Sequence, residues 1–243
     1  MNTFLDIQGI YKKFGKDSIL TDVNLHLEKN MVLSLLGSSG SGKTTLLKII
    51  AGLETQDKGD ILLYGKNINR QKPQQRNIVY LYQEALLFPH LDAFENVAFG
   101  LRLKKLKESV IKEKVDLMLK NLGMTNHASK MPSQLSGGQR QRISFGRAMV
   151  IEPELLLLDE PFGALDSSTR GKMQELFKSL AHAMQISALF VTHDLKEAIV
   201  MGDQIGKIKK GELLQYETKK DFFNDEHSEV HKEIDFWTNI KNN

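Results

Sequence analysis

The sequence predicts an α/β fold: a mostly parallel sheet flanked by helices, with an α-rich insert between its strands. Three short apolar runs indicate strands buried on both faces, because such strands read as continuous apolar segments. They are residues 31–36, 155–158 and 188–191. A glycine follows the first run, and polar residues follow the other two. Residues that follow the carboxyl ends of parallel strands lie at the edge where such sheets bind ligands. A helical period between the first two runs predicts the insert.

The elements outside these runs show two other patterns. Residues 3–8 and 18–27 partly alternate apolar and polar side chains, which is typical of half-buried strands. Residues 108–122 place five apolar side chains on one helical face, with Gly123 as the expected helix end. The five are Ile111, Val115, Met118, Leu119 and Leu122. Asp92, with Glu95 three positions later, resembles a capping box and predicts a further helix start.

Length and composition limit the classes of function. The 243 residues, 41% hydrophobic, suit one large α/β domain, and a single domain over residues 1–243 is expected. Because 33 basic residues nearly balance 30 acidic ones, the charge gives no reason to expect nucleic acid as a partner. The lack of cysteine excludes disulfides and cysteine metal sites. No apolar run approaches the roughly 20 residues that cross a bilayer, and the N-terminus lacks a signal-peptide core, so a cytosolic location is expected.

The stretch GSSGSGKT fits the phosphate-binding pattern G-x-x-x-x-G-K-[ST], between an apolar strand and an apolar helix at 45–51. Glycines let successive backbone amides turn toward phosphate oxygens, and the helix N-terminus adds partial positive charge. The lysine is expected to reach the β- and γ-phosphates, and the final hydroxyl to ligate Mg²⁺. The residues are Gly37, Ser38, Ser39, Gly40, Ser41, Gly42, Lys43 and Thr44, followed by Thr45. The alternative, a Gly/Ser-rich turn with a chance lysine, fits the flanking elements less well.

Two adjacent carboxylates follow the run 155–158. We expect Asp159 to contact Mg²⁺ directly or through water. We expect Glu160 to polarise the attacking water, because neighbouring side chains at a strand end point in different directions. Alone, these residues would indicate only an acidic turn. Beside a phosphate-binding loop they predict a nucleoside triphosphatase, and kinases, GTPases, helicases and transport ATPases all stay open, although no N-K-x-D stretch for guanine is present.

The stretch LSGGQ, residues 135–139, indicates a second anion site. A serine followed by two glycines is typical of a helix start with exposed backbone amides, and such starts bind anions. Glycine also allows a phosphate to approach the backbone closely. The stretch does not by itself show which molecule carries that phosphate.

Together these stretches resemble an ATP-binding cassette (ABC) ATPase. The resemblance covers roughly residues 4–211 and rests on six stretches in the family's order. They are residues 37–44, 80–83, 135–139, 155–161 and 164–166, and His193. The resemblance implies a P-loop NTPase core with an N-terminal antiparallel β subdomain and an inserted α-helical subdomain at about residues 87–152.

The resemblance also implies how ATP is bound. Two cassettes, either two copies of this chain or one copy with a paralogous ABC ATPase, would pair head to tail. The signature of one would then contact ATP held by the other. This assigns five residues to ATP on the partner: Ser136, Gly137, Gly138, Gln139 and Asp166.

Further roles follow residue by residue from the same resemblance. Gln83 would bind ATP and join Thr44 and Asp159 at Mg²⁺. Catalysis would rest on three side chains, Lys43, Glu160 and His193. Tyr11 would stack on adenine, although Tyr11 or Phe14 could instead pack on the first sheet.

Residues 87–101, LFPHLDAFENVAFGL, are similar to those of bacterial importers for polyamines, sulfate, molybdate, iron and sugars. In the family this region receives a cytoplasmic helix of the membrane subunit, although part of it is expected to be helical core. The resemblance implies an ATPase that energises import of a small solute. Its partners would be a transmembrane permease and a solute-binding protein, at the cytoplasmic face of the inner membrane. An exporter, a lipoprotein-release system and a soluble non-transport ABC ATPase remain alternatives.

The C-terminal residues depart from many such importers, which continue into a β-rich regulatory domain. Here a short polar tail at about residues 215–243 is expected, with Phe222, Phe223 and Trp237 as candidate anchors. His227 and His231, four residues apart, could face a metal, but the flanking glutamates favour a solvated charged helix.

Overall fold

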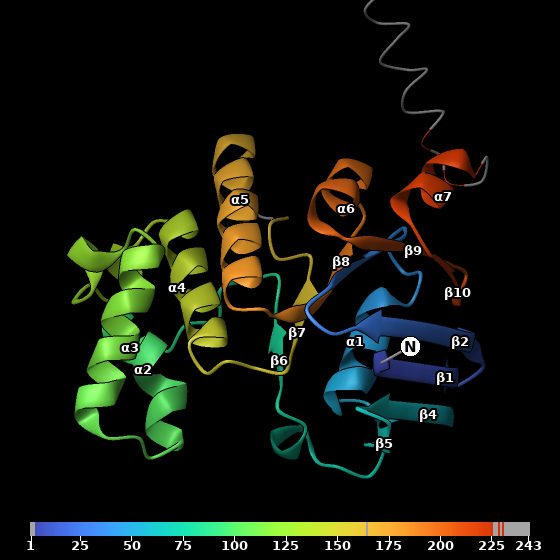
Figure 1. The fold of residues 1–243 in the computed structure, drawn as a ribbon, viewed down its shortest axis with the longest axis horizontal. Coiled ribbons are helices and arrows are strands. Elements are labelled where there is room, and N and C mark those ends of the chain that lie inside the picture. The colour runs from blue at the N-terminus through green and yellow to red at the C-terminus, as the bar shows by residue number, and fades with distance from the viewer. Residues whose placement is uncertain (1–2, 164, 226–227, 229, 231–243) are drawn as a thin grey trace, which may run out of the picture. The chain divides into compact units, whose positions relative to one another are not determined.

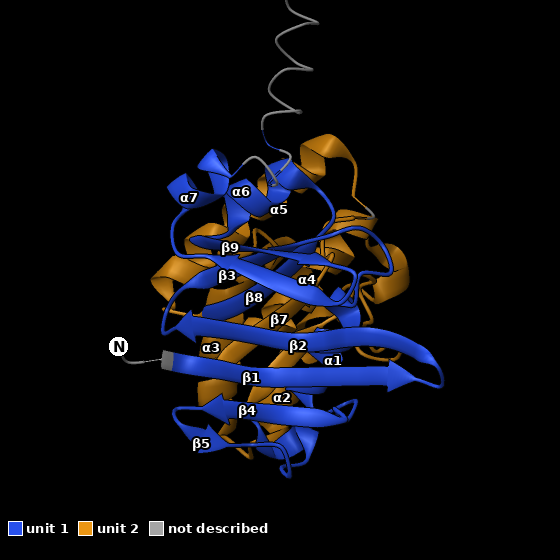
Figure 2. Ribbon diagram, turned by 90° about the vertical axis from the view of Figure 1, so that its right-hand side faces the viewer, with its two compact units in different colours: residues 1–76, 187–243 blue, residues 77–186 orange. Residues whose placement is uncertain are grey.

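The computed structural model describes residues 3–163, 165–225, 228 and 230, with elements labelled in Figure 1. They form two compact units, coloured separately in Figure 2. The first unit runs to Arg76 and resumes at Ser187, and the second is Asn77–Ile186. Both units combine strands with helices, so the predicted α/β class is confirmed.

An antiparallel sheet opens the first unit. Its strands β1 (Thr3–Phe14), β2 (Asp17–Glu28), β4 (Lys58–Leu63) and β5 (Lys66–Asn67) lie in the order β2-β1-β4-β5. Along β2 most buried side chains alternate with exposed ones, as the sequence pattern predicts for a strand with one face on the core. The predicted N-terminal antiparallel β subdomain is therefore present. A short 3₁₀ helix, η1 (Pro73–Gln75), follows it.

A second set of strands in this unit is mostly parallel. Strand β3 (Val32–Leu36) pairs in parallel with β8 (Ser187–Thr192) and with β9 (Gln204–Lys209), and β10 (Glu212–Tyr216) runs antiparallel to β9. Every residue of β3 and β8 is buried, which explains why most of their side chains are apolar. The register pairs Leu36 with Thr192, so the two strands end level with each other. Three helices accompany them: α1 (Lys43–Ala51), α6 (Leu195–Met201) and α7 (Lys219–Asn224).

The second unit has two parallel strands, β6 (Ile78–Leu81) and β7 (Leu155–Asp159). Its helices are α2 (Ala93–Leu103), α3 (Glu108–Asn121), α4 (Gly137–Met149) and α5 (Ser167–Ala183), with 3₁₀ turns η2 (Thr125–His127) and η3 (Pro132–Gln134). Helix α2 packs on α3 and α4. The predicted apolar face of α3 is confirmed, because all five of its residues are buried. Gly123 follows with a positive φ of 65°, as expected just past a helix end.

Two details differ from the sequence-based expectation. Asp92 does cap α2 by accepting from the Glu95 amide, but the Glu95 carboxylate pairs with Arg102 at 2.8 Å. Residues 215–224, the described start of the expected polar tail, include the end of β10 and all of α7, and the candidate anchor Phe222 is buried there. Trp237, His227 and His231 lie outside the described residues.

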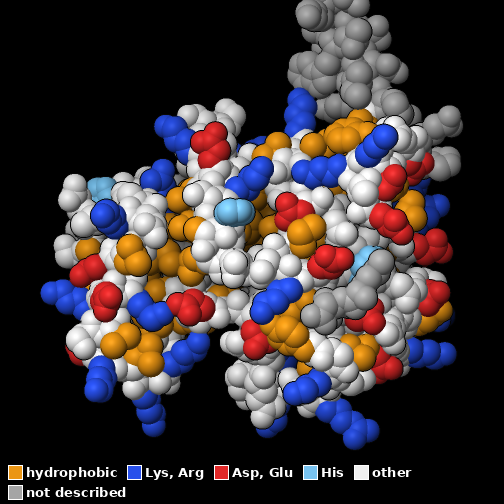
Figure 3. Space-filling view, viewed as in Figure 1, with side chains coloured by type: hydrophobic (Ala, Val, Ile, Leu, Met, Phe, Trp, Pro, Cys, Tyr) orange, Lys and Arg blue, Asp and Glu red, His pale blue; other side chains and the backbone are white. Residues whose placement is uncertain are grey.

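Charged side chains are distributed rather than segregated. On the face in Figure 3, basic and acidic side chains alternate, in keeping with the net charge of +3. Among the residues that the structure describes, no helix has the length and apolar character needed to cross a membrane.

Candidate functional site

The predicted phosphate-binding loop connects β3 to α1 in the first unit. Gly42 caps α1 with φ 104°, in the left-handed region that favours glycine. A Cβ on Gly42 would lie 2.9 Å from the Ile19 carbonyl oxygen, and one on Gly37 would lie 2.5 Å from the Ile208 carbonyl oxygen. Close backbone packing therefore requires glycine at both positions, and the positive φ is a second reason at Gly42.

Two buried polar side chains belong to this loop. Lys43 is 4% exposed, and its ammonium donates to the carbonyl oxygens of Gly37 at 2.7 Å and Ser38 at 2.9 Å. Ser41 is 5% exposed, and its Oγ has no hydrogen-bond partner among the described residues. A buried hydroxyl without a partner costs free energy, so this group is suited to a ligand oxygen. Ser38, Ser39, Gly40 and Thr44 are exposed, and Thr45 is half-buried.

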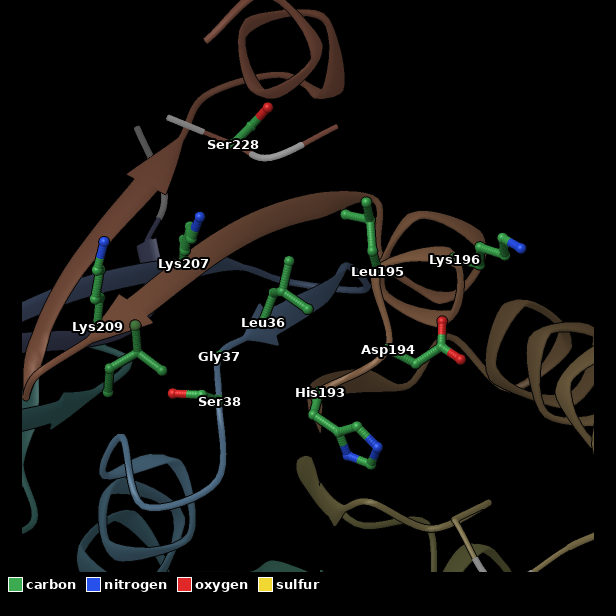
Figure 4. A pocket seen from close by; sticks show the side chains of 11 residues that line it. Leu36, Gly37, Ser38, His193, Asp194, Leu195, Lys196, Lys207, Lys209 and Ser228 are labelled. Atoms are coloured by element: carbon green, nitrogen blue, oxygen red, sulfur yellow. The ribbon is translucent and has the colours of Figure 1, made fainter. Parts of the chain in front are cut away.

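His193 lies at the same edge of the strands as the loop. The Gly37 amide donates to the Thr192 carbonyl oxygen at 3.3 Å, which ties the start of the loop to the end of β8. A cavity of about 550 Å³ is lined by Gly37, Ser38 and His193, together with Lys207 and Lys209 of β9 (Figure 4). The structure thus brings the phosphate-binding loop and His193 together.

A buried carboxylate supports the segment that carries His193. The Thr192 hydroxyl donates to Glu197, which is 7% exposed, and accepts from the Asp194 amide at 3.0 Å. Asp194 in turn caps α6 by accepting from the Glu197 amide at 3.0 Å. Neither Thr192 nor Glu197 was predicted for this role, because a glutamate in the first turn of a helix usually faces water.

Tyr11 and Phe14 both lie on β1 near its end. The Tyr11 ring is half-buried, with the Lys58 ammonium 5.9 Å from its centroid, whereas Phe14 is 48% exposed, with Lys12 at 4.8 Å. Neither ring is fully buried in the first sheet. Stacking of Tyr11 on adenine stays a prediction.

Asp159 and Glu160 are placed at the end of β7 in the second unit. Both are half-buried. The Tyr80 hydroxyl on β6 donates to Asp159 Oδ2 at 2.6 Å. Burial, with the Asp159 carboxylate as a second cause, raises the pKa of Tyr80 above its ordinary value, so the phenol keeps the proton that it donates. Glu160 has a φ of 45° and its carbonyl oxygen accepts from Gly163 at 3.1 Å, so the chain turns sharply directly after Asp159.

Gln83 lies beside this turn. A Cβ placed on Gly163 would be 3.0 Å from Gln83 Nε2, so the exposed glutamine reaches the segment that follows Glu160. Three residues predicted for one site, Gln83, Asp159 and Glu160, therefore gather within the second unit. Tyr80 was missed as an individual site residue, because its contact depends on which strand neighbours β7.

The signature stretch begins helix α4, as predicted. Ser136 is the N-cap: its Oγ accepts from the Gln139 amide at 3.3 Å, and Gln139 Oε1 accepts from the Ser136 amide at 2.9 Å. A Cβ on Gly138 would lie 2.7 Å from Thr169, whereas one on Gly137 would meet nothing within 4 Å. Packing thus requires Gly138 to be glycine, while Gly137 is left open by its neighbours.

A second cavity, of about 450 Å³, adjoins this helix start. The signature residues line it together with Asp166 and Thr169. Asp166 caps α5 by accepting from the Ser168 and Thr169 amides at 3.1 and 3.0 Å, and its hydrogen bonds to Thr169 lower its pKa. The structure therefore places Asp166 with the signature residues. Ala164, from the same loop, lies outside the described residues.

The oxygen-bearing side chains predicted for Mg²⁺ are a hydroxyl, a carboxylate and an amide. Oxygen donors of this kind suit a hard cation, and P-loop sites supply few protein ligands because phosphates and water complete the shell. Over the described ranges, no group of three or more histidines and carboxylates is arranged to hold a metal. The chemistry of the predicted donors therefore fits Mg²⁺ bound with a nucleotide rather than a metal held by the protein alone.

Comparison with known proteins gave one family and many relatives. The model of the ABC transporter family matches residues 20–163. The chain is 44% identical over 221 residues to the spermidine/putrescine import ATP-binding protein PotA of Clostridium novyi, covering 91% of this chain and 64% of that protein. It is 44% identical over 223 residues to the sulfate/thiosulfate import ATP-binding protein CysA of Bacillus cereus, covering 90% and 62%. The PotA protein of Clostridioides difficile is 44% identical over 225 residues, with 93% and 65% covered.

These alignments cover nearly all of this chain but less of each relative. The chain spans under two thirds of the length of the curated relatives that it matches.

Proposed function

The chain belongs to the ABC transporter family, and from that premise we propose that it binds and hydrolyses ATP to energise import of a small solute through a separate membrane subunit. The observation that carries the proposal is the loop between β3 and α1. There Lys43 is buried, Ser41 Oγ has no partner in the part of the chain that the structure describes, and His193 lies at the same strand edge. A buried cation and an unsatisfied buried hydroxyl beside a helix start are the groups that a triphosphate would engage.

Hydrolysis would rest on positioning and charge rather than on covalent chemistry. Lys43 and the loop amides would hold the phosphate oxygens. We propose Glu160 to accept a proton from the attacking water and His193 to contact the γ-phosphate. Thr44, Asp159 and Gln83 would hold Mg²⁺, which when bound neutralises charge on the phosphates.

The signature would act on ATP held by a second cassette, either another copy of this chain or a paralogue. Support comes from the cavity that joins Ser136, Gly138 and Asp166 at a helix N-terminus. A phosphate placed there would meet backbone amides and the Ser136 hydroxyl. ATP would then join two chains, and its hydrolysis would release them.

Import is favoured by the names of the relatives, which are import ATP-binding proteins for polyamines and for sulfate. The proposed location is the cytoplasmic face of the inner membrane, with a permease and a solute-binding protein as partners. Tyr82 is 40% exposed and Leu86 53% exposed, and such apolar surface suits the docking of a permease helix. Because the names of those relatives give different solutes, we propose only that the imported molecule is a small solute.

The test is the variant Glu160→Gln, which keeps the shape of the side chain but removes the base. We expect ADP formation to fall about 10²–10⁴-fold, the usual contribution of a general base. The ATP affinity of the variant should equal that of the parent, and light scattering should detect a dimer of the variant in the presence of Mg-ATP. Glu175→Gln, at an exposed position on α5 in the same unit, is the matched control and should leave all three measurements unchanged. Parental ADP formation by Glu160→Gln would contradict the proposed role.

A further inference from the structure

The hydrogen bond from Tyr80 to Asp159 joins two neighbouring strands. On β6 and β7 the register pairs Tyr80 with Leu157, so Asp159 lies two residues further along β7 on the same face as Leu157. The long tyrosine side chain spans that offset and places its hydroxyl 2.6 Å from Asp159 Oδ2. This distance is typical of a hydroxyl donating to a carboxylate, and hydrogen bonds to charged groups are stronger than those between neutral groups.

The tyrosine ring has its own support. The rings of Tyr80 and Tyr82 lie 4.6 Å apart between centroids, inclined by 48°. Tyr82 is followed directly by Gln83, whose side chain reaches the turn after Glu160. A continuous set of contacts therefore runs from the Gln83 loop through two aromatic rings to the Asp159 carboxylate.

We propose that Tyr80 is a positioning residue that fixes the orientation of the Asp159 carboxylate for Mg²⁺ binding. The proposal rests on the function proposed above. The torsion that rotates a carboxylate about its last bond is broad, so an unsupported aspartate samples many orientations. A hydroxyl that donates to one carboxylate oxygen restricts this rotation, and partners that orient metal ligands typically change metal affinity by 10–100-fold.

A purely structural role is the competing explanation, because the same hydrogen bond links β6 to β7. The two explanations differ in what Mg²⁺ does. A structural bond affects folding whether or not Mg²⁺ is present. A positioning bond affects the gain in ATP affinity that Mg²⁺ produces, and leaves metal-free ATP binding alone.

The test uses Tyr80→Phe, which removes the hydroxyl and keeps the ring that packs on Tyr82. ATP affinity is measured by titration calorimetry in EDTA and again with saturating Mg²⁺. We expect Tyr80→Phe to bind ATP in EDTA as the parent does, while the Mg²⁺-dependent gain shrinks by about 10–100-fold. Tyr82→Phe, which removes a neighbouring hydroxyl, is the matched control. It should show the same Mg²⁺-dependent gain in ATP affinity as the parent. Tyr80→Met also removes the donor, and serves if Tyr80→Phe fails to accumulate in folded form.

Two results would overturn the proposal. One is a parental Mg²⁺-dependent gain in Tyr80→Phe. The other is an equal loss of ATP affinity with and without Mg²⁺, accompanied by a lower unfolding midpoint, which would make the role structural. If the parent itself shows no gain with Mg²⁺, the proposed function fails independently of Tyr80.

Discussion

At the scale of single residues, Thr192 makes hydrogen bonds in three directions at the end of β8. Its carbonyl oxygen accepts from the Gly37 amide, while its hydroxyl accepts from Asp194 and donates to Glu197. The residue thus connects the phosphate-binding loop to the segment that carries His193. Glu197 is the buried end of this set, and its loss would leave the Thr192 hydroxyl without its acceptor.

We expect Glu197→Ala to lower the free energy of unfolding by about 1–3 kcal/mol, the cost of a buried polar group that loses its partner. Glu197→Gln should lose less, because its amide oxygen still accepts from Thr192. Urea denaturation gives the stability difference. If His193 acts on the γ-phosphate, ADP formation should fall further in Glu197→Ala than in Glu197→Gln. If both variants lose the same stability and the same rate of ADP formation, the hydrogen bond from Thr192 contributes to neither.

Sequence analysis predicted individual site residues where the chemistry is local. Lys43 begins α1, Ser136 caps α4 and Asp159 ends β7, as their contiguous motifs imply, while their roles in binding and catalysis stay predictions. The contacts of Tyr80 and Glu197 were not predicted. The first depends on β6 lying beside β7, and the second on a helix folding back over a strand end. Glu197 lies only five positions after Thr192, but no motif in that stretch indicates that the glutamate is buried.

At the scale of elements, helix starts are the recurring device. Asp92, Ser136, Asp166, Asp194 and Thr218 each accept from an amide in the first turn of a helix. Asp166 has a further property, since hydrogen bonding to Thr169 lowers its pKa below the ordinary 3.8. A lowered pKa in the folded state means that the carboxylate stabilises the fold above the unfolded-state pKa. This contribution is lost as pH falls through the folded-state value.

We therefore expect Asp166→Ser to lose stability relative to the parent at pH 7, and the difference to shrink as pH falls below about 3.8. Serine keeps a side-chain acceptor for the cap but does not titrate. Urea midpoints for both proteins between pH 7 and pH 3 measure the effect. A difference that stays constant over this range would contradict the assignment of the pH dependence to Asp166.

Periodicity predicted the elements well where packing follows from a single face. Helix α3 is the clearest case, because the five apolar residues predicted for its inner face are all buried, whereas Leu117 on another face is exposed. Periodicity was less successful where a residue distant in the sequence determines the contacts of a side chain. Glu95 turns to Arg102 rather than back to its own cap, because a guanidinium offers a charged partner. Phe222 is a candidate anchor in the sequence, but its edge-to-face partner Tyr216 depends on how α7 packs on β10.

At the scale of the whole molecule, the proposed site needs two chains, and mixing inactive variants tests this directly. Lys43→Ala removes the phosphate-binding ammonium, and Ser136→Arg blocks the signature of the chain that carries it. In a mixed dimer, one site would combine the intact loop of one chain with the intact signature of the other. Random pairing then leaves about a quarter of all sites complete.

We expect an equimolar mixture to form ADP faster than either variant alone. Mixing dilutes each variant, so a control mixture combines Lys43→Ala with Tyr82→Phe, a variant of the parent that keeps both halves of the site. If the Lys43→Ala and Ser136→Arg mixture stays as inactive as its components, each chain must complete its own site. The head-to-tail arrangement would then be wrong.

Ile19 occupies a narrow place in the first unit. A Cβ added to Gly42 would come within 2.9 Å of the Ile19 carbonyl oxygen, and one added to Gly211, in the turn between β9 and β10, within 2.4 Å of the same oxygen. The Ile19 peptide group therefore packs closely on both the turn between β9 and β10 and the loop between β3 and α1. A side chain at position 211 would therefore press on the same peptide group that packs against Gly42, so a residue in the β9–β10 turn constrains the backbone at the start of α1.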